Sequence, residues 1–150
     1  MRDINFRGKR TDNGEWVYGV PTKDGRGEMV MVENIFECEE YNCRGANCLY
    51  VDENTVGQYT GLKDKNGTKI FEGDIVKCVD ANNGGSFPAI VSFGNPNREY
   101  NWGFQLVQTG AENLNTDILL WVDMEEAGAY IKVISNIYDA AKTIGGNNNG

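Results

Sequence analysis

The sequence contains no histidine. Histidine is the side chain whose ordinary pKa lies nearest to neutral pH, and it is the commonest nitrogen ligand of metals in proteins. Its absence excludes the Ser-His and Cys-His pairs that activate a nucleophile in many hydrolases. We therefore expect a protein that acts by binding rather than by catalysis, with no cofactor and no catalytic residues.

Proline and long apolar runs are also scarce. Three prolines stand against 19 glycines, a balance typical of many tight turns rather than of extended linkers. No apolar run approaches the roughly 18 residues that a membrane span needs. The charged N-terminal residues are not followed by the apolar stretch of a secretory signal. A hydrophobic content of 40% is enough for a packed core. We expect a soluble, cytoplasmic protein with no membrane contact.

Cations are the minority charge, and the net charge is −8. Seven acids and a single cation, Arg44, lie between Glu28 and Glu53, and residues 110–130 carry five acids and no cation. A negative field repels nucleic acid, so nucleic-acid binding is disfavoured for most of the chain. The N-terminal arm is the exception, because in its first ten residues four cations face only Asp3: Arg2, Arg7, Lys9 and Arg10.

Turn chemistry predicts a mainly β fold. Asn13-Gly14 favours a hairpin that places Trp16 and Tyr18 on one face. Apolar segments then recur at short intervals between turn residues, as in a small barrel or sandwich. Trp102, Phe104 and Leu106 alternate, and we expect them to share a buried face. The segment 118–128 is either a strand or a short helix capped by Asp117.

The four cysteines are Cys38, Cys43, Cys48 and Cys78. The first three have the spacing C-x4-C-x4-C, which lacks the C-x2-C pairs of structural zinc sites. We therefore predict no metal site, although the sequence leaves open whether these thiols pair or bind a metal. Cys78 lies in an apolar segment and is expected in the core.

Three carboxylates in the middle of the chain need a separate explanation. Asp64-Lys65-Asn66-Gly67 lacks the further ligands of a calcium loop, so Asp64 is predicted to cap its turn. Glu72 and Asp74 share a face because they lie two positions apart, but without burial they would simply repel or cap. A metal-dependent hydrolase using Asp64, Glu72 or Asp74 remains an alternative.

Aromatic side chains and cations together form another candidate. Trp16, Tyr18, Tyr59, Tyr100 and Trp102 can form a stacking platform for bases, or equally the core of a small β protein. The polar start of the central segment leaves room for a pocket. The candidate binding residues are Arg7, Arg10, Gln58, Tyr59, Thr60 and Lys63.

The segment Val56–Lys77, VGQYTGLKDKNGTKIFEGDIVK, resembles the core signature of the YopX family of phage and prophage proteins. Met1–Gly19 and Val133–Tyr138 resemble the opening and the end of the same family. The resemblance implies a phage or prophage origin and a bacterial host cytoplasm. It also implies a mainly β fold that ends in a small SH3-like β-barrel, a core that we place at 55–144 with little helix. The Asn-Gly turn predicts an N-terminal β-hairpin arm at 1–54, and the tail at 145–150 cannot bury anything and is expected to be disordered. The family has no established activity.

Our hypothesis is a phage accessory protein that works by binding, as a homo-oligomer or on a host protein. Exposed strand edges favour such pairing, and an acidic surface suits a basic partner. The alternative from another class is a nucleic-acid or nucleotide-binding module that uses the basic N-terminal arm and the aromatics.

Overall fold

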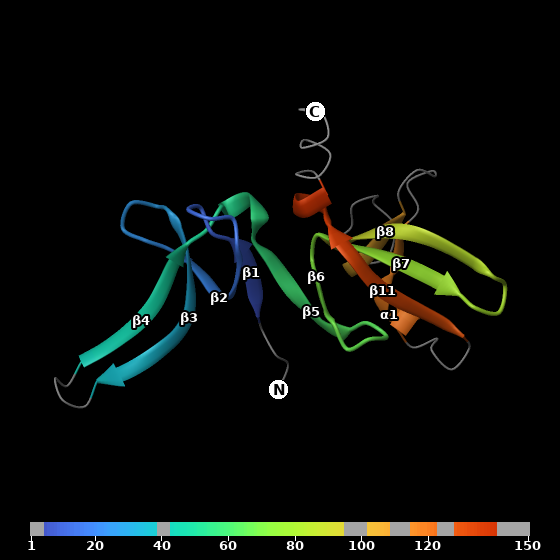
Figure 1. The fold of residues 1–150 in the computed structure, drawn as a ribbon, viewed down its shortest axis with the longest axis horizontal. Helices are drawn as coiled ribbons and strands as arrows, with labels where there is room; N and C mark the ends of the chain where they lie inside the picture. Colours follow the sequence, from blue (N-terminus) through green and yellow to red (C-terminus); the bar gives the residue numbers. More distant parts are fainter. Residues whose placement is uncertain (1–4, 39–42, 95–101, 109–114, 123–127, 141–150) are drawn as a thin grey trace. The chain divides into compact units, whose positions relative to one another are not determined.

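The computed structural model describes residues 5–38, 43–94, 102–108, 115–122 and 128–140. The chain divides into two compact units, Met1–Tyr59 and Thr60–Gly150. The predicted boundary after residue 54 lies just before this division, and the predicted disordered tail at 145–150 lies outside the described residues. Among these residues the strands form two antiparallel sheets, one of six strands and one of five (Figure 1). The prediction of a mainly β protein is confirmed.

The first unit contains the predicted N-terminal hairpin, which is confirmed, and a second, longer hairpin beside it (Figure 1). Its strands are β1 (Phe6–Lys9), β2 (Trp16–Lys23), β3 (Met29–Cys38) and β4 (Cys43–Tyr50). Arg10 and Val51 form an isolated bridge, which ties the chain after β4 back to the end of β1. Val17, Met31 and Val51 are buried together and form the core of this unit. The unit is therefore more than a hairpin arm.

The central segment supplies three strands and two turns. They are β5 (Gly57–Lys63), β6 (Lys69–Phe71) and β7 (Asp74–Asp80). The beginning of β5 pairs with β1, and its remainder forms a hairpin with β6. The order of strands and turns is the one that the sequence predicts.

The second unit holds the five-stranded sheet in the order β10-β9-β8-β7-β11. The new strands are β8 (Gly85–Gly94), β9 (Gly103–Gln108), β10 (Asn115–Asp117) and β11 (Ala129–Asn136). One face of this sheet is buried, and Val76, Cys78, Ala89, Val91 and Leu106 form the centre of its core. Among the described residues β10 and β11 do not pair with each other, so no closed barrel is seen.

The structure decides between helix and strand for one segment, and it corrects the predicted burial of one tryptophan. The segment Ile118–Val122 is the short helix α1 rather than a strand, and the backbone N–H of Leu119 donates to Asp117 Oδ1 at 2.9 Å, as the predicted cap requires. Phe104 and Leu106 are buried as predicted, but Trp102 is 73% exposed. Trp102 precedes the first paired residue of β9, Gly103, so it lies beyond the core, and its ring packs on Phe93.

Candidate functional site

The turn between β5 and β6 is organised by a buried carboxylate. Asp64 Oδ1 accepts hydrogen bonds from the backbone N–H groups of Asn66 at 2.8 Å and Thr68 at 2.9 Å. Its other oxygen, Oδ2, accepts from the N–H of Val133 in β11 at 2.9 Å. Asp64 caps its own turn, as predicted, and also ties that turn to the closing strand of the chain.

The same turn covers the edge of β11. The backbone N–H of Lys65 donates to the carbonyl of Ile131 at 3.1 Å. Because β11 is the last strand of its sheet, these groups of Ile131 and Val133 lie on the side away from β7. The turn therefore satisfies backbone groups that an open sheet edge would leave exposed.

The Gly73-Asp74 break makes a second contact between the central segment and the chain's end. Asp74 is buried, and its Oδ2 accepts from the N–H of Phe71 at 2.8 Å. The N–H of Ile137 donates to the carbonyl of Gly73 at 2.9 Å, and Asn136 lies opposite Asp74 in the β7–β11 register. Asp74 thus has a structural role in its turn, whereas Glu72 is only half-buried.

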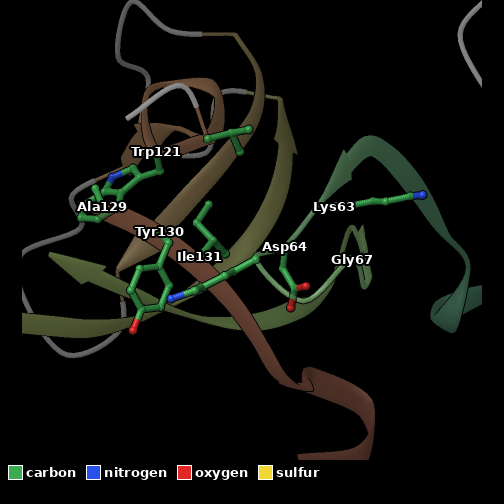
Figure 2. A pocket seen from close by; sticks show the side chains of 9 residues that line it. Lys63, Asp64, Gly67, Trp121, Ala129, Tyr130 and Ile131 are labelled. Atoms are coloured by element: carbon green, nitrogen blue, oxygen red, sulfur yellow. The ribbon is translucent and has the colours of Figure 1, made fainter. Parts of the chain in front are cut away.

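A cleft of about 280 Å³ lies between this turn, α1 and β11 (Figure 2). Its lining includes Lys63, Asp64, Lys65, Trp121, Tyr130 and Ile131. The ammonium group of Lys65 lies 4.1 Å from the centre of the Tyr130 ring, a cation–π distance. Figure 2 shows the carboxylate of Asp64 directed away from Tyr130. The cleft therefore presents aromatic walls and a cation, and Asp64, the carboxylate among its described lining residues, accepts hydrogen bonds from backbone N–H groups.

The predicted binding residues belong to both units: Arg7, Arg10, Gln58 and Tyr59 to the first, and Thr60 and Lys63 to the second. Arg7 is buried, with its guanidinium 4.5 Å from the centre of the Trp16 ring. Arg10 is exposed in part and its Nε donates to Asp12 Oδ1 at 2.9 Å, which lowers the pKa of Asp12. The cation–aromatic contact that the sequence predicts thus exists, but Arg7 lies beneath the surface.

The polar start of the central segment is also largely buried. Tyr59 is 4% exposed, and the hydroxyl of Thr60 donates to the carbonyl of Ile70 at 2.8 Å. Gln58 is half-buried and pairs with Phe6. Lys63 is exposed and lines the cleft, although Figure 2 shows its side chain pointing away from Tyr130. Binding by these residues stays a prediction.

Sequence reasoning missed Lys65, Trp121 and Tyr130. Lys65 was visible as a cation within the turn, but its aromatic partner, Tyr130, comes much later in the chain. The hydrogen bonds between the turn and β11 hold these two residues near each other.

Two of the four cysteine side chains are described, and both are free thiols. Cys48 is exposed. Cys78 is buried in the core, as predicted, and burial raises the pKa of its thiol to about 12. The side chains of Cys38 and Cys43, and the ring of Tyr100, lie outside the described residues. In the part of the chain that the structure describes, no three His, Cys, Asp or Glu side chains gather as metal ligands would.

No helix within the described ranges has the length and apolar character needed to cross a membrane.

Both the sequence and the fold of this chain are similar to those of known proteins. The family described as YopX protein matches residues 5–144, which include most of both units and the contacts of Asp64, Lys65 and Gly73 with the end of the chain. The chain belongs to the YopX family. A similar solved structure is the crystal structure of protein EF1440 from Enterococcus faecalis, with a TM-score of 0.55 and 20% identity. The match covers 91% of this chain and 94% of that chain, and it shows a shared fold. No curated protein matches the sequence.

Proposed function

We propose that this YopX protein is a phage or prophage accessory protein that works by binding another protein rather than by catalysis. The observation that carries the proposal is an exposed aromatic pair in the second unit. Trp102 is 73% exposed and Phe93 is 51% exposed, and their rings pack edge to face with centroids 6.3 Å apart. Large exposed aromatics that are supported from beneath are typical anchors of protein interfaces.

The support beneath this pair comes from the core. Phe93 also packs on Phe104, with ring centroids 5.0 Å apart, and Phe104 belongs to the core of the second unit. An anchor that is already held in place loses little conformational entropy on binding. The partner is either a second copy of the chain or a protein of the bacterial host, and the place of action is the host cytoplasm.

Sedimentation velocity of the purified chain over a range of concentrations separates these two partners. If the chain self-associates through the aromatic pair, Trp102→Ser shifts it to the monomer, whereas Leu120→Ser does not. Leu120 is a matched control because it is 56% exposed in the same unit. Self-association that survives Trp102→Ser would contradict a role for this pair in self-assembly.

A second candidate function, nucleic-acid binding by the first unit, is favoured by the contacts of Trp16. The ammonium of Lys9 lies 5.3 Å from the centre of the Trp16 ring, on the face that also carries Arg7. If this face binds DNA, Lys9→Ala and Arg10→Ala weaken binding, and affinity falls steeply with salt. Absence of a mobility shift at low salt would rule the candidate out.

We also propose that the second unit is a small, incomplete SH3-like barrel. The hydrogen bonds from the β5–β6 turn to Ile131 and Val133 support this, because they extend the sheet beyond β11. Hydrogen exchange tests it: the amides of Lys65 and Val133, which bond on the outer side of β11, should be protected as strongly as the β11 amides that pair with β7. Exchange at the rate of an open turn would contradict the proposal.

A further inference from the structure

The cleft beside β11 stands out because three lysines near it have no carboxylate partner among the described residues. Lys65, Lys77 and Lys132 are exposed, and none makes an ion pair within the described part of the chain. By contrast, Lys23 and Arg26 in the first unit are paired with carboxylates. In a chain with a net charge of −8, exposed cations without an acidic partner among the described residues are available to an anionic ligand.

The register of the sheet places these lysines in a continuous row. Lys132 lies directly opposite Lys77 in the β7–β11 pair. Like charges at directly opposite positions destabilise an antiparallel pair, so an anion bound between them would relieve a local cost. Tyr130 is two positions before Lys132 and shares its face, and Lys65 lies over the Tyr130 ring. The row therefore leads from Lys77 to the mouth of the cleft.

The cleft itself fits a flat ring beside an anion. Trp121 and Tyr130 supply aromatic walls, and the volume of 280 Å³ is close to the lower end of the range of about 300–1,000 Å³ that is usual for small-molecule sites. Trp121 is held by an edge-to-face contact with Phe87 at 5.3 Å. The carboxylate of Asp64 accepts three backbone hydrogen bonds and points away from Tyr130 (Figure 2).

We propose that this cleft binds a nucleoside phosphate, either free or as part of a single strand. The base packs against Trp121 and Tyr130, a phosphate is bound by Lys65, and further phosphates of a strand follow Lys132 and Lys77. Aromatic stacking beside a row of cations is the usual physical basis for binding single strands and nucleotides. The site is in the second unit, so it is separate from the N-terminal arm, and it goes beyond the protein-binding function proposed above.

Isothermal titration calorimetry of the full chain with mononucleotides tests the site. We expect Lys65→Gln to weaken binding about ten-fold, because a charge-assisted hydrogen bond is lost. Lys23→Gln is the matched control: it makes the same charge change on an exposed side chain of the first unit that does not line the cleft, and it should change affinity less than about two-fold. Both side chains are exposed, so neither variant should unfold, and melting curves check this.

Single-stranded oligonucleotides distinguish the two sources of the phosphate. If the ligand is a strand, Lys77→Gln with Lys132→Gln weakens oligonucleotide binding and lowers its salt dependence. If the ligand is a free nucleotide, this double variant leaves mononucleotide affinity unchanged while Lys65→Gln reduces it.

Trp121 provides an independent readout. A nucleotide in the cleft should change the tryptophan fluorescence of the wild type, and the change should be lost in Trp121→Phe. Three results would overturn the proposal: no binding of any nucleotide or oligonucleotide, equal affinity of Lys65→Gln and wild type, or inorganic phosphate competing as well as the nucleotide.

Discussion

At the residue scale, Asp64 connects the central segment of this YopX protein to its closing strand, β11. Its two carboxylate oxygens bind the turn that follows it and the N–H of Val133, far along the chain. A carboxylate is suited to this role because it accepts several hydrogen bonds at once and donates none. The sequence shows the turn, whereas the second attachment depends on the fold.

Asp64→Ala is predicted to lower the free energy of unfolding by about 2–3 kcal/mol, because three backbone N–H groups lose their acceptor. Urea denaturation of the full chain measures this. Asp12→Ala is the control, since the ion pair of Asp12 with Arg10 is exposed to solvent and its loss should change stability much less. Equal stability of the two variants would show that Asp64 is not a structural tie.

The two described thiols should differ strongly in reactivity. Burial raises the pKa of Cys78 to about 12, so its reactive thiolate is scarce near neutral pH, whereas Cys48 is exposed. Alkylation of the native protein followed by peptide mass spectrometry should label Cys48 and spare Cys78 until denaturant is added. Labelling of both at the same rate would place Cys78 outside the core.

At the element scale, the glycine before β7 is where the central segment and the chain's end come closest. Gly73 has φ of +87°, and a Cβ there would lie 3.1 Å from Tyr138 Cε2. Gly67 has a similar φ of +81°, but a Cβ there would contact nothing within 4 Å. The two positions share the same backbone strain and differ only in crowding.

Replacing each glycine by alanine separates these two costs. Gly67→Ala should lower the free energy of unfolding by about 1 kcal/mol, from backbone strain alone. Gly73→Ala should lower it by about 2 kcal/mol or more, because Tyr138 must also move. Chemical denaturation of both variants measures the difference, and a Gly73→Ala loss no larger than that of Gly67→Ala would contradict the close approach.

The loop between β2 and β3 gives the first unit an acid-sensitive contact. Asp24 accepts hydrogen bonds from the N–H groups of Glu28 and Arg26 and from the hydroxyl of Tyr50 in β4. These bonds lower the pKa of Asp24 below its ordinary value of 3.8. A lowered pKa in the folded state means that this stabilisation is present above pH 3.8 and is lost as the pH falls toward the folded-state value.

Melting temperatures of the wild type and Asp24→Asn, measured from neutral pH downward, test this contact. The wild type should be the more stable at neutral pH, and the gap should narrow as the pH falls below 3.8. A gap that is independent of pH would show that the charge of Asp24 contributes nothing.

The sequence predicted the elements of this fold better than their assembly. Asn-Gly turns and apolar alternation were sufficient for the N-terminal hairpin and for the strands around Val56–Lys77, because these features depend on local backbone preferences. The helical state of Ile118–Val122 depends on packing, and the exposure of Trp102 depends on where β9 begins, so local pattern alone did not decide either. The pairing of Lys77 with Lys132 required the register of β11, which no local signal carries.

At the scale of the whole molecule, the YopX match covers both units, so the family is defined by the first unit as well as by the central segment. The two units offer different surfaces. The first carries the exposed acids Glu28, Glu33 and Glu53, whereas the second carries the Phe93–Trp102 pair and the unpaired lysines.

The most direct test of the central claim, that this protein acts by binding through its exposed aromatic pair, is quantitative affinity capture. Tagged wild type, Trp102→Ser and Leu120→Ser are incubated with lysate of the bacterial host that also contains untagged copies of the chain, and captured proteins are measured by mass spectrometry. We expect wild type and Leu120→Ser to capture the same partner, a host protein or the untagged chain, and Trp102→Ser to capture it much less. Equal capture by all three proteins would show that the protein does not bind its partner through the aromatic pair.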